Sequence, residues 1–194
     1  DSKSQVYSAS LKNDGTQSLA GTSDLTDLNG LNEGSFSFRA FLTTNTLPYQ
    51  YVIYNMTALS PGNGIFFMFR EDGVAVIAYF YGTRIEFNYT PTVNAWHHIV
   101  LVKTSTQIKV YADGVNIYTV SATTSSINFS NITSISSAPN GSNMMNGNVQ
   151  DIRFYATALT QGDVTELYQT RHMVDKDYNQ YAYELVEDTD SSMS

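Results

Sequence analysis

Hydrophobic and polar side chains alternate with a period of two along several stretches of this chain. The clearest stretch runs from Gly34 to Leu42, where every second residue is apolar. Successive side chains of an extended chain point to opposite faces, so this pattern predicts a strand with one face in a core. We expect the core face to carry Phe36, Phe38, Ala40 and Leu42, and the opposite face to carry Ser37, Arg39 and Phe41.

Further strand-like segments follow, separated by turns rich in glycine, proline, asparagine and aspartate. Asp113-Gly114 separates two of them and is a strong signal for a β-hairpin. Many short strands with frequent turns favour an antiparallel sandwich. The expected strands span residues 49–56, 65–69, 74–81, 84–89, 96–103, 107–112 and 115–120, and an edge segment is expected within 127–135.

One short helix is predicted after the last strand. Thr160 is a suitable N-cap, and Asp163, three residues later, completes a capping box. Val164 and Leu167 share one helical face, so we expect them to hold the helix against the sandwich.

Two parts of the chain resemble a known family. Trp96 to Lys103, followed by Ile108 to Val115, resembles the W-x-H-x-A-x-V and L-Y-x-D-G signature of laminin-G-like and pentraxin-like domains. Gly147 to Tyr168 resembles the closing strand and helix of the same domains. The resemblance spans residues 15–170 and implies an all-β fold, a two-sheet antiparallel jelly-roll β-sandwich of the concanavalin-like kind with one short C-terminal helix.

The same resemblance leads us to expect Trp96 in the core, against residues such as Phe38 and Val110. His97 and His98 are adjacent on a strand, so their side chains must point to opposite faces. We therefore expect one packed histidine beside Trp96 and one at the sheet surface, not a shared metal site.

We interpret residues 1–170 as one sandwich domain and residues 171–194 as a polar, acidic C-terminal tail or arm. Three tyrosines within residues 178–183 would let such an arm pack on a neighbouring subunit. Because the sequence begins with Asp1 and not with methionine, we expect it to be a processed or excised piece.

The formal net charge is −8, and the ten Lys and Arg residues form no cluster. Nucleic-acid phosphate needs a basic stripe, so we expect no nucleic-acid partner. No apolar run is long enough to span a bilayer, and we expect no direct membrane insertion. The absence of cysteine excludes disulfides and a thiolate nucleophile. The family resemblance implies an extracellular, cell-surface or virion-surface location.

Glycoside hydrolases of the concanavalin-like fold resemble this chain in architecture, so catalysis must be considered. They need two carboxylates that flank the scissile bond, and the Glu-x-Asp-x-x-Glu motif that supplies them is absent. Glu86 stands alone on its strand, and Glu166 lies on the predicted helix. We therefore expect no enzymatic activity and no catalytic residue.

Pentraxin-like domains hold calcium in loops at one rim, with several carboxylates among six to eight oxygen ligands. The chain has Gly62-Asn63 where the family has Asp-Asn, and its 137–146 loop contains no acid. An acid elsewhere, such as Asp24 or Asp72, would have to replace them. We therefore expect no metal site and no cofactor.

A glycan site is compatible with the same rim. Such sites use aromatic faces for stacking and amide groups for sugar hydroxyls. The alternative for any single position is structural, since tyrosine is a good strand former and asparagine suits turns. The candidate ligand-binding residues are Asn63, Asn140, Asn143, Asn146, Tyr54 and Tyr81.

These observations favour a non-catalytic surface recognition module that binds a glycan or a protein partner. The alternative is a structural component of a virion, fibre or cell-surface assembly, contacting neighbouring subunits through the C-terminal tail. An enzyme ranks third.

Overall fold

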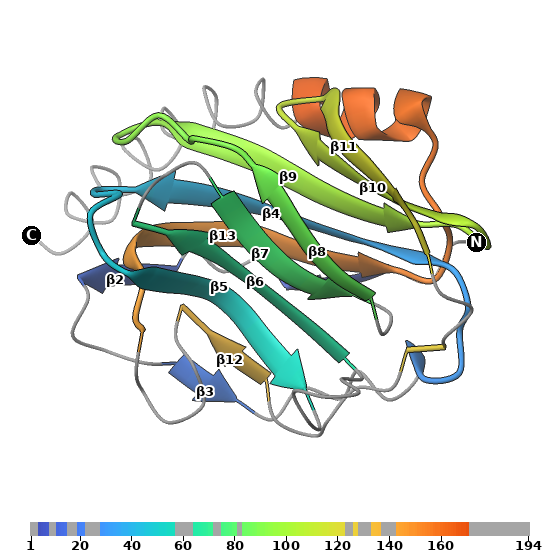
Figure 1. Ribbon diagram of the computed structural model, residues 1–194, viewed down its shortest axis with the longest axis horizontal. Helices are drawn as coiled ribbons and strands as arrows, with labels where there is room; N and C mark the ends of the chain where they lie inside the picture. The colour runs from blue at the N-terminus through green and yellow to red at the C-terminus, as the bar shows by residue number, and fades with distance from the viewer. Residues whose placement is uncertain are drawn as a thin grey trace, which may run out of the picture.

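The computed structural model describes residues 4–7, 11–14, 19–21, 28–56, 64–71, 75–80, 83–122, 126–127, 133–136 and 143–170. Within them two antiparallel sheets face each other, and one helix lies at the C-terminal end (Figure 1). This arrangement confirms the predicted sandwich. In the described part of the chain, no helix has the length and apolar character needed to cross a membrane. The tail, 171–194, lies outside the described residues, so the arm and the domain boundary stay predictions.

The first sheet has seven strands and contains both segments that resemble the family signature. Its strands are β1 (Ser4–Tyr7), β2 (Leu11–Asp14), β4 (Gly34–Leu42), β9 (Trp96–Lys103), β10 (Gln107–Ala112), β11 (Val115–Ser121) and β13 (Asn146–Tyr155). Their order is β1-β13-β4-β9-β10-β11, and β2 also pairs with β13. The β10–β11 hairpin turns at Asp113 and Gly114, with φ of 50° and 82°, as the Asp-Gly signal predicts.

The second sheet has six strands. They are β3 (Leu19–Gly21), β5 (Tyr49–Met56), β6 (Gly64–Arg70), β7 (Ala75–Phe80), β8 (Thr83–Asn88) and β12 (Thr133–Ile135). Their order is β3-β12-β5-β6-β7-β8. The prediction of an edge segment within 127–135 is wrong for β12, because this strand pairs with β3 on one side and with β5 on the other.

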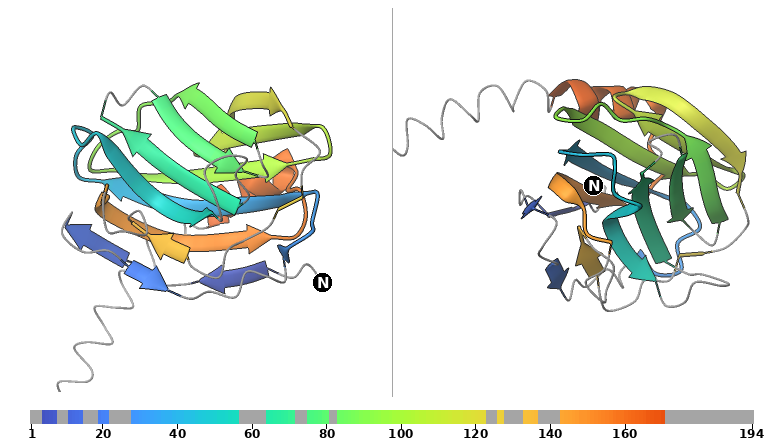
Figure 2. Two further views of the ribbon diagram at one scale, coloured as in Figure 1. Left: turned by 60° about the horizontal axis from the view of Figure 1, so that its bottom comes forward. Right: turned by 60° about the vertical axis from the view of Figure 1, so that its left-hand side comes forward.

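The two sheets lie face to face (Figure 2), and the buried apolar side chains of both sheets form one core. Phe36 stacks on Phe154 with ring centroids 4.6 Å apart, and Phe38 meets Phe67 edge-on across the sandwich at 4.9 Å. Burying a phenylalanine contributes roughly 1.5–3 kcal/mol. The four residues expected on the core face of β4 are all fully buried, which confirms the alternation.

The C-terminal helix, residues 161–170, covers part of the outer face of the first sheet (Figure 1). The Thr160 amide donates to Asp163 Oδ2 at 2.7 Å, and the Asp163 amide donates to Thr160 Oγ1 at 3.2 Å, which confirms the capping box. Val164 is fully buried against Val100, Val102 and Tyr111. Leu167 is only partly buried. The first sheet is therefore packed on both faces beneath the helix.

Trp96 does not lie in the core. It is the first residue of β9, is 37% exposed, and packs on Phe41 of β4 with ring centroids 5.6 Å apart. Side chains along a strand alternate between its two faces. Ile99 of β9 points into the core, so Trp96, at an odd number of residues from Ile99, points to the outer face. The expected contacts of Trp96 with Phe38 and Val110 are therefore wrong.

Candidate ligand-binding surface on the second sheet

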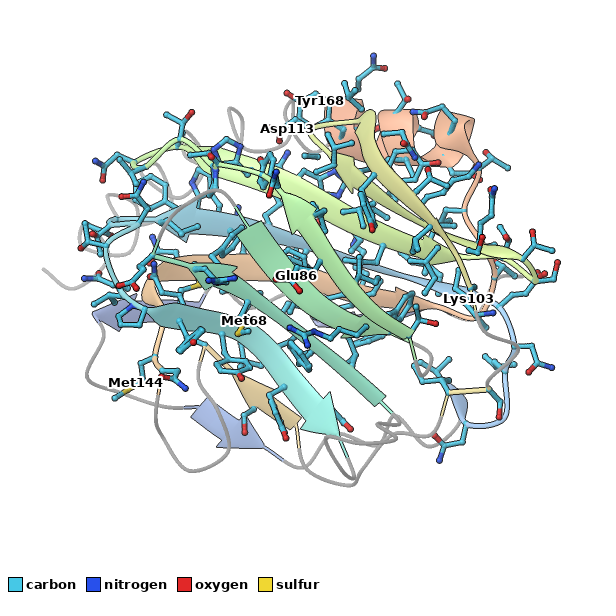
Figure 3. All side chains as sticks on the ribbon, viewed as in Figure 1. Met68, Glu86, Lys103, Asp113, Met144 and Tyr168 are labelled. Carbon is cyan, nitrogen blue, oxygen red and sulfur yellow. The ribbon has the colours of Figure 1, made fainter. Side chains whose placement is uncertain are left out.

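The outer face of the second sheet carries four side chains that we call the aromatic patch: Tyr51 and Tyr54 from β5, and Phe66 and Met68 from β6. Tyr51 lies 5.8 Å from Tyr54 and 5.9 Å from Phe66, between ring centroids. Tyr54 stacks on Phe66 at 6.4 Å with the ring planes 17° apart. Phe66 and Met68 are each 7% exposed, so the partly buried tyrosines present the accessible ring surface. Figure 3 labels Met68 over this sheet.

A break in the strand register brings the two tyrosines together. Tyr51 pairs with Met68 and Ile53 pairs with Phe67, so Val52 is an extra residue on β5. Both Val52 and Ile53 are fully buried. In a regular strand Tyr51 and Tyr54 would point to opposite faces. The bulge shifts the period by one residue and places both rings on the outer face.

The phenol of Tyr51 lies among other phenols. Burial is the largest effect that raises the pKa of Tyr51 above its ordinary value, and the nearby Tyr54 and Tyr49 raise this pKa further. Its hydroxyl therefore stays protonated at neutral pH. Tyr49 is 44% exposed and extends the accessible ring surface along β5. The patch thus combines apolar ring faces with hydroxyls that can donate and accept hydrogen bonds.

The segment before β13 borders the patch. The Tyr51 amide donates to the Asn143 carbonyl at 3.1 Å, and Tyr51 forms a parallel bridge with Met144. Asn143 is exposed with φ of 52°, a left-handed conformation that asparagine tolerates. The Asn146 amide donates to Oε1 of the fully buried Gln50 at 3.0 Å. These hydrogen bonds hold this loop beside β5.

Charged residues border the patch toward β8. The register aligns Tyr51, Met68, Ile77 and Glu86 in one row across the sheet, and Tyr54, Phe66, Tyr79 and Arg84 in the next. Glu86 lies between two arginines, 3.5 Å from Arg70 and 3.2 Å from Arg84. Glu86 and Met68 are labelled over the same sheet in Figure 3.

The predicted ligand-binding residues divide into two groups. Tyr54 belongs to the patch, and Asn143 and Asn146 lie in the segment beside it. Asn63, Asn140 and Tyr81 lie outside the described residues. The prediction missed Tyr51, Phe66 and Met68. Alternation within residues 65–69 could have indicated the last two, because Ile65, Phe67 and Phe69 are the core-facing residues there.

The two histidines point to opposite sides of β9, as expected, but neither lies on an open sheet surface. His98 is 2% exposed, and its ring stacks on Tyr168 of the C-terminal helix at 6.2 Å, so it is the packed histidine. The side chain of His97 is only 12% exposed, so the expected surface position of the second histidine is wrong. His97 Nδ1 is 2.9 Å from Asp113 Oδ2, and its Nε2 is 3.1 Å from the Thr92 carbonyl. The hydrogen bond to Asp113 raises the pKa of His97. This histidine joins the start of β9 to the β10–β11 turn.

Among the described residues, no three His, Asp or Glu side chains come together in a way that could hold a metal ion. Asn63 and most of the 137–146 loop lie outside the described residues, as do Asp24 and Asp72. We expect the addition of calcium or EDTA to leave the melting temperature of the protein unchanged. A site saturated at a hundred times its Kd would add roughly 2.7 kcal/mol. A calcium-dependent rise of several degrees in a thermal melt, reversed by EDTA, would contradict this expectation.

Comparison with known proteins agrees with this fold. A laminin G-type family model, described as the concanavalin A-like lectin/glucanases superfamily, matches residues 14–165. Comparison with curated protein sequences found no match.

Similar solved structures include binding domains of botulinum neurotoxins. That of serotype G has a TM-score of 0.64 at 11% identity over 88% of this chain and 46% of that one. A serotype D/C binding domain has a TM-score of 0.61 at 15% identity over 87% and 47%. A type C toxin, whose cell entry depends on interaction with two ganglioside molecules, has a TM-score of 0.58 at 15% identity over 88% and 46%. This chain thus spans about half the length of the structures it matches.

Proposed function

We propose that this chain, which belongs to the concanavalin A-like lectin/glucanases superfamily, is a non-catalytic surface recognition module that binds glycan at the aromatic patch. The observation that carries the proposal is the gathering of Tyr51, Tyr54 and Phe66 on one sheet face, with ring centroids 5.8 to 6.4 Å apart. Tyrosine faces can stack on the C–H side of a sugar ring while hydroxyls and a neighbouring amide bind its hydroxyl groups.

The position of Asn143 supports this assignment. It is exposed, and its carbonyl accepts from the Tyr51 amide, so this residue lies beside β5 at the border of the aromatic patch. The ganglioside interaction of the type C toxin is that protein's property. A ganglioside carries a glycan, which makes glycan the first class of ligand to test. As such a module, the protein acts outside the cell, at a cell or virion surface.

Three of the described carboxylates support a non-catalytic role. Glu86 lies between two arginines, Asp113 binds His97 and the His98 amide, and Asp163 caps the C-terminal helix. A retaining or inverting glycosidase needs one carboxylic acid and one carboxylate facing a shared substrate. Each of these three groups instead has a structural partner.

The experiment is a glycan array with the full chain, followed by calorimetric titration of the strongest hit. We expect Tyr54→Ala to weaken binding about tenfold, since an aromatic contact of this kind contributes about 0.5–1.5 kcal/mol. We expect Asn143→Gly to weaken it as well. Glycine is the suitable replacement because φ is 52° at this position, where alanine would strain the backbone.

Two variants serve as matched controls. Tyr118 is partly buried and stacks on Phe87 at 5.3 Å, away from the patch, so Tyr118→Ala removes a comparable contact. Asn94 is exposed with φ of 59°, so Asn94→Gly matches the change at Asn143. Both should bind glycan as the wild-type chain does. Equal losses in the patch variants and the controls would overturn the proposed site. Failure of the wild-type chain to bind any glycan would favour the structural-component alternative.

A further inference from the structure

A second candidate site lies on the other sheet, beside the C-terminal helix. A cleft of about 600 Å³ opens over the outer face of β9, β10 and β11, and the segment 158–161 forms its wall. Its volume lies within the range of small-molecule sites, roughly 300–1,000 Å³. It does not overlap the aromatic patch, which is on the outer face of the opposite sheet.

The floor of this cleft is built by strand register. Val102, Lys109 and Thr119 form one row across β9, β10 and β11, and Tyr111 and Asn116 belong to the next. Val102 and the ring of Tyr111 are almost fully buried and provide an apolar base. Lys109 is partly buried, while Asn116 and Thr119 are exposed. An apolar floor with a few polar groups above it is the usual composition of a ligand site.

The wall is held in place by Gln161, the first residue of the helix. Its Nε2 donates to the Gly114 carbonyl at 2.8 Å and lies 3.2 Å from Thr165 Oγ1. Gly114 belongs to the β10–β11 turn, and an added Cβ there would lie 3.2 Å from the ring of Tyr168. Figure 3 labels Tyr168 and Asp113 at the same end of the molecule, where the helix meets the hairpin turn. The helix is thus joined to the hairpin, and the cleft beside this joint has fixed sides.

Two nitrogen donors of the cleft can face a ligand, the Lys109 ammonium and the Asn116 amide. The hydroxyl of Thr119 donates to Asn116 Oδ1 at 3.3 Å, which leaves the Asn116 NH2 group to donate to a ligand. Lys109 is the single charged residue among the described residues that line the cleft. In a chain with a net charge of −8, a cleft lined by one ammonium and no carboxylate selects for a negatively charged ligand.

We propose that this cleft binds a carboxylated sugar, such as a uronic or sialic acid, with its carboxylate on the Lys109 ammonium. The Asn116 amide donates to one sugar hydroxyl, the Thr119 oxygen accepts from another, and the apolar base of Val102 and Tyr111 lies beneath the sugar ring. Hydrogen bonds between an ammonium and a carboxylate are stronger than those between neutral groups, so the charge decides which sugars bind.

The test titrates the full chain with methyl glucuronide and, separately, with uncharged methyl glucoside, followed by calorimetry or NMR chemical shifts. We expect the glucuronide to bind at least about tenfold more tightly than the glucoside. Lys109→Gln should remove this preference. Asn116→Asp, which adds a carboxylate at an exposed position, should weaken glucuronide binding by a similar factor.

Controls separate this cleft from general charge effects and from the aromatic patch. Arg84→Gln and Asn88→Asp make the same changes of charge at exposed positions of β8 on the second sheet, and should leave glucuronide binding unchanged. Tyr54→Ala should also leave glucuronide binding unchanged. Loss of binding at the aromatic patch and loss of binding at the cleft can therefore be distinguished. Equal affinity for both sugars, full binding by Lys109→Gln, or no binding by the wild-type chain at millimolar glucuronide would each overturn the proposal.

Discussion

Replacing Gly147 with alanine is expected to lower the free energy of unfolding by about 3 kcal/mol, the upper range for overpacking a core. Gly147 has φ of 156° at the start of β13. A Cβ at this position would overlap the carbonyl oxygen of Phe41 and lie 3.1 Å from the Cα of Leu42. Backbone atoms cannot turn aside as a side chain can. The neighbouring Thr43 amide is also bonded to the Asn146 carbonyl at 2.9 Å, which holds the two strands together.

The matched control is Gly162→Ala in the first turn of the C-terminal helix. The nearest atom to a Cβ there is Thr160 Oγ1 at 3.6 Å, an ordinary contact. Alanine in a helix is favoured over glycine by about 0.5–1 kcal/mol, so this variant should be slightly more stable than the wild type. Denaturant unfolding of both variants measures the difference. Equal midpoints would contradict the close approach of β13 to β4 at Gly147.

The second large predicted effect is a loss of folding stability at acidic pH. The pKa of His98 is lowered from its ordinary value of 6.5 to about 4, mainly by burial and secondly by the nearby positive charge of Arg39. The unfolded chain therefore takes up this proton at a higher pH than the folded protein does. The stability that neutral His98 provides is complete above about pH 6.5 and is lost as the pH falls toward 4. The loss amounts to about 3 kcal/mol at pH 4, from about 1.4 kcal/mol for each unit of pKa.

His97 acts in the opposite direction. Its hydrogen bond to Asp113 raises its pKa, so its contribution is complete below about pH 6.5 and is lost as the pH rises through the folded-state pKa. We expect His98→Gln to flatten the fall in unfolding free energy between about pH 7 and pH 4, and His97→Gln to steepen it. Denaturant titrations at a series of pH values measure both slopes. An unchanged slope in His98→Gln would show that His98 is not the buried neutral group described here.

The predictions that succeeded depend on neighbours in sequence. The alternation in β4, the Asp113-Gly114 hairpin and the Thr160–Asp163 capping box each involve residues a few positions apart. Backbone geometry alone determines which of these side chains can meet. The location of Trp96 could also have been predicted from β9 itself, since the period of two puts it on the face opposite Ile99. The resemblance to the family signature was given more weight than this alternation, so Trp96 was wrongly predicted to lie in the core.

The aromatic patch depends on contacts between distant segments. Tyr51 and Tyr54 share a face because of a bulge, and the extra residue, Val52, is bonded through its carbonyl to the Ser136 amide at 3.0 Å. A period of two read along residues 49–56 places these tyrosines on opposite faces, so sequence reasoning missed Tyr51. Asn143 reaches the patch through a bridge between segments that are about ninety residues apart in the chain.

The sequence alone therefore determined strands β4 to β11, the hairpin turn, the helix cap and the sandwich class, because local periodicity and turn chemistry act within a few residues. It did not predict β1 and β2. Only the tertiary structure decided which faces are covered. Ser37 and Arg39 have the polar character of a solvated strand face, yet they are 1% and 3% exposed beneath the helix side of the first sheet. His98 is buried for the same reason, under a helix about seventy residues away in sequence. Burial depends on what packs over a residue, and periodicity within one strand carries no information about that neighbour.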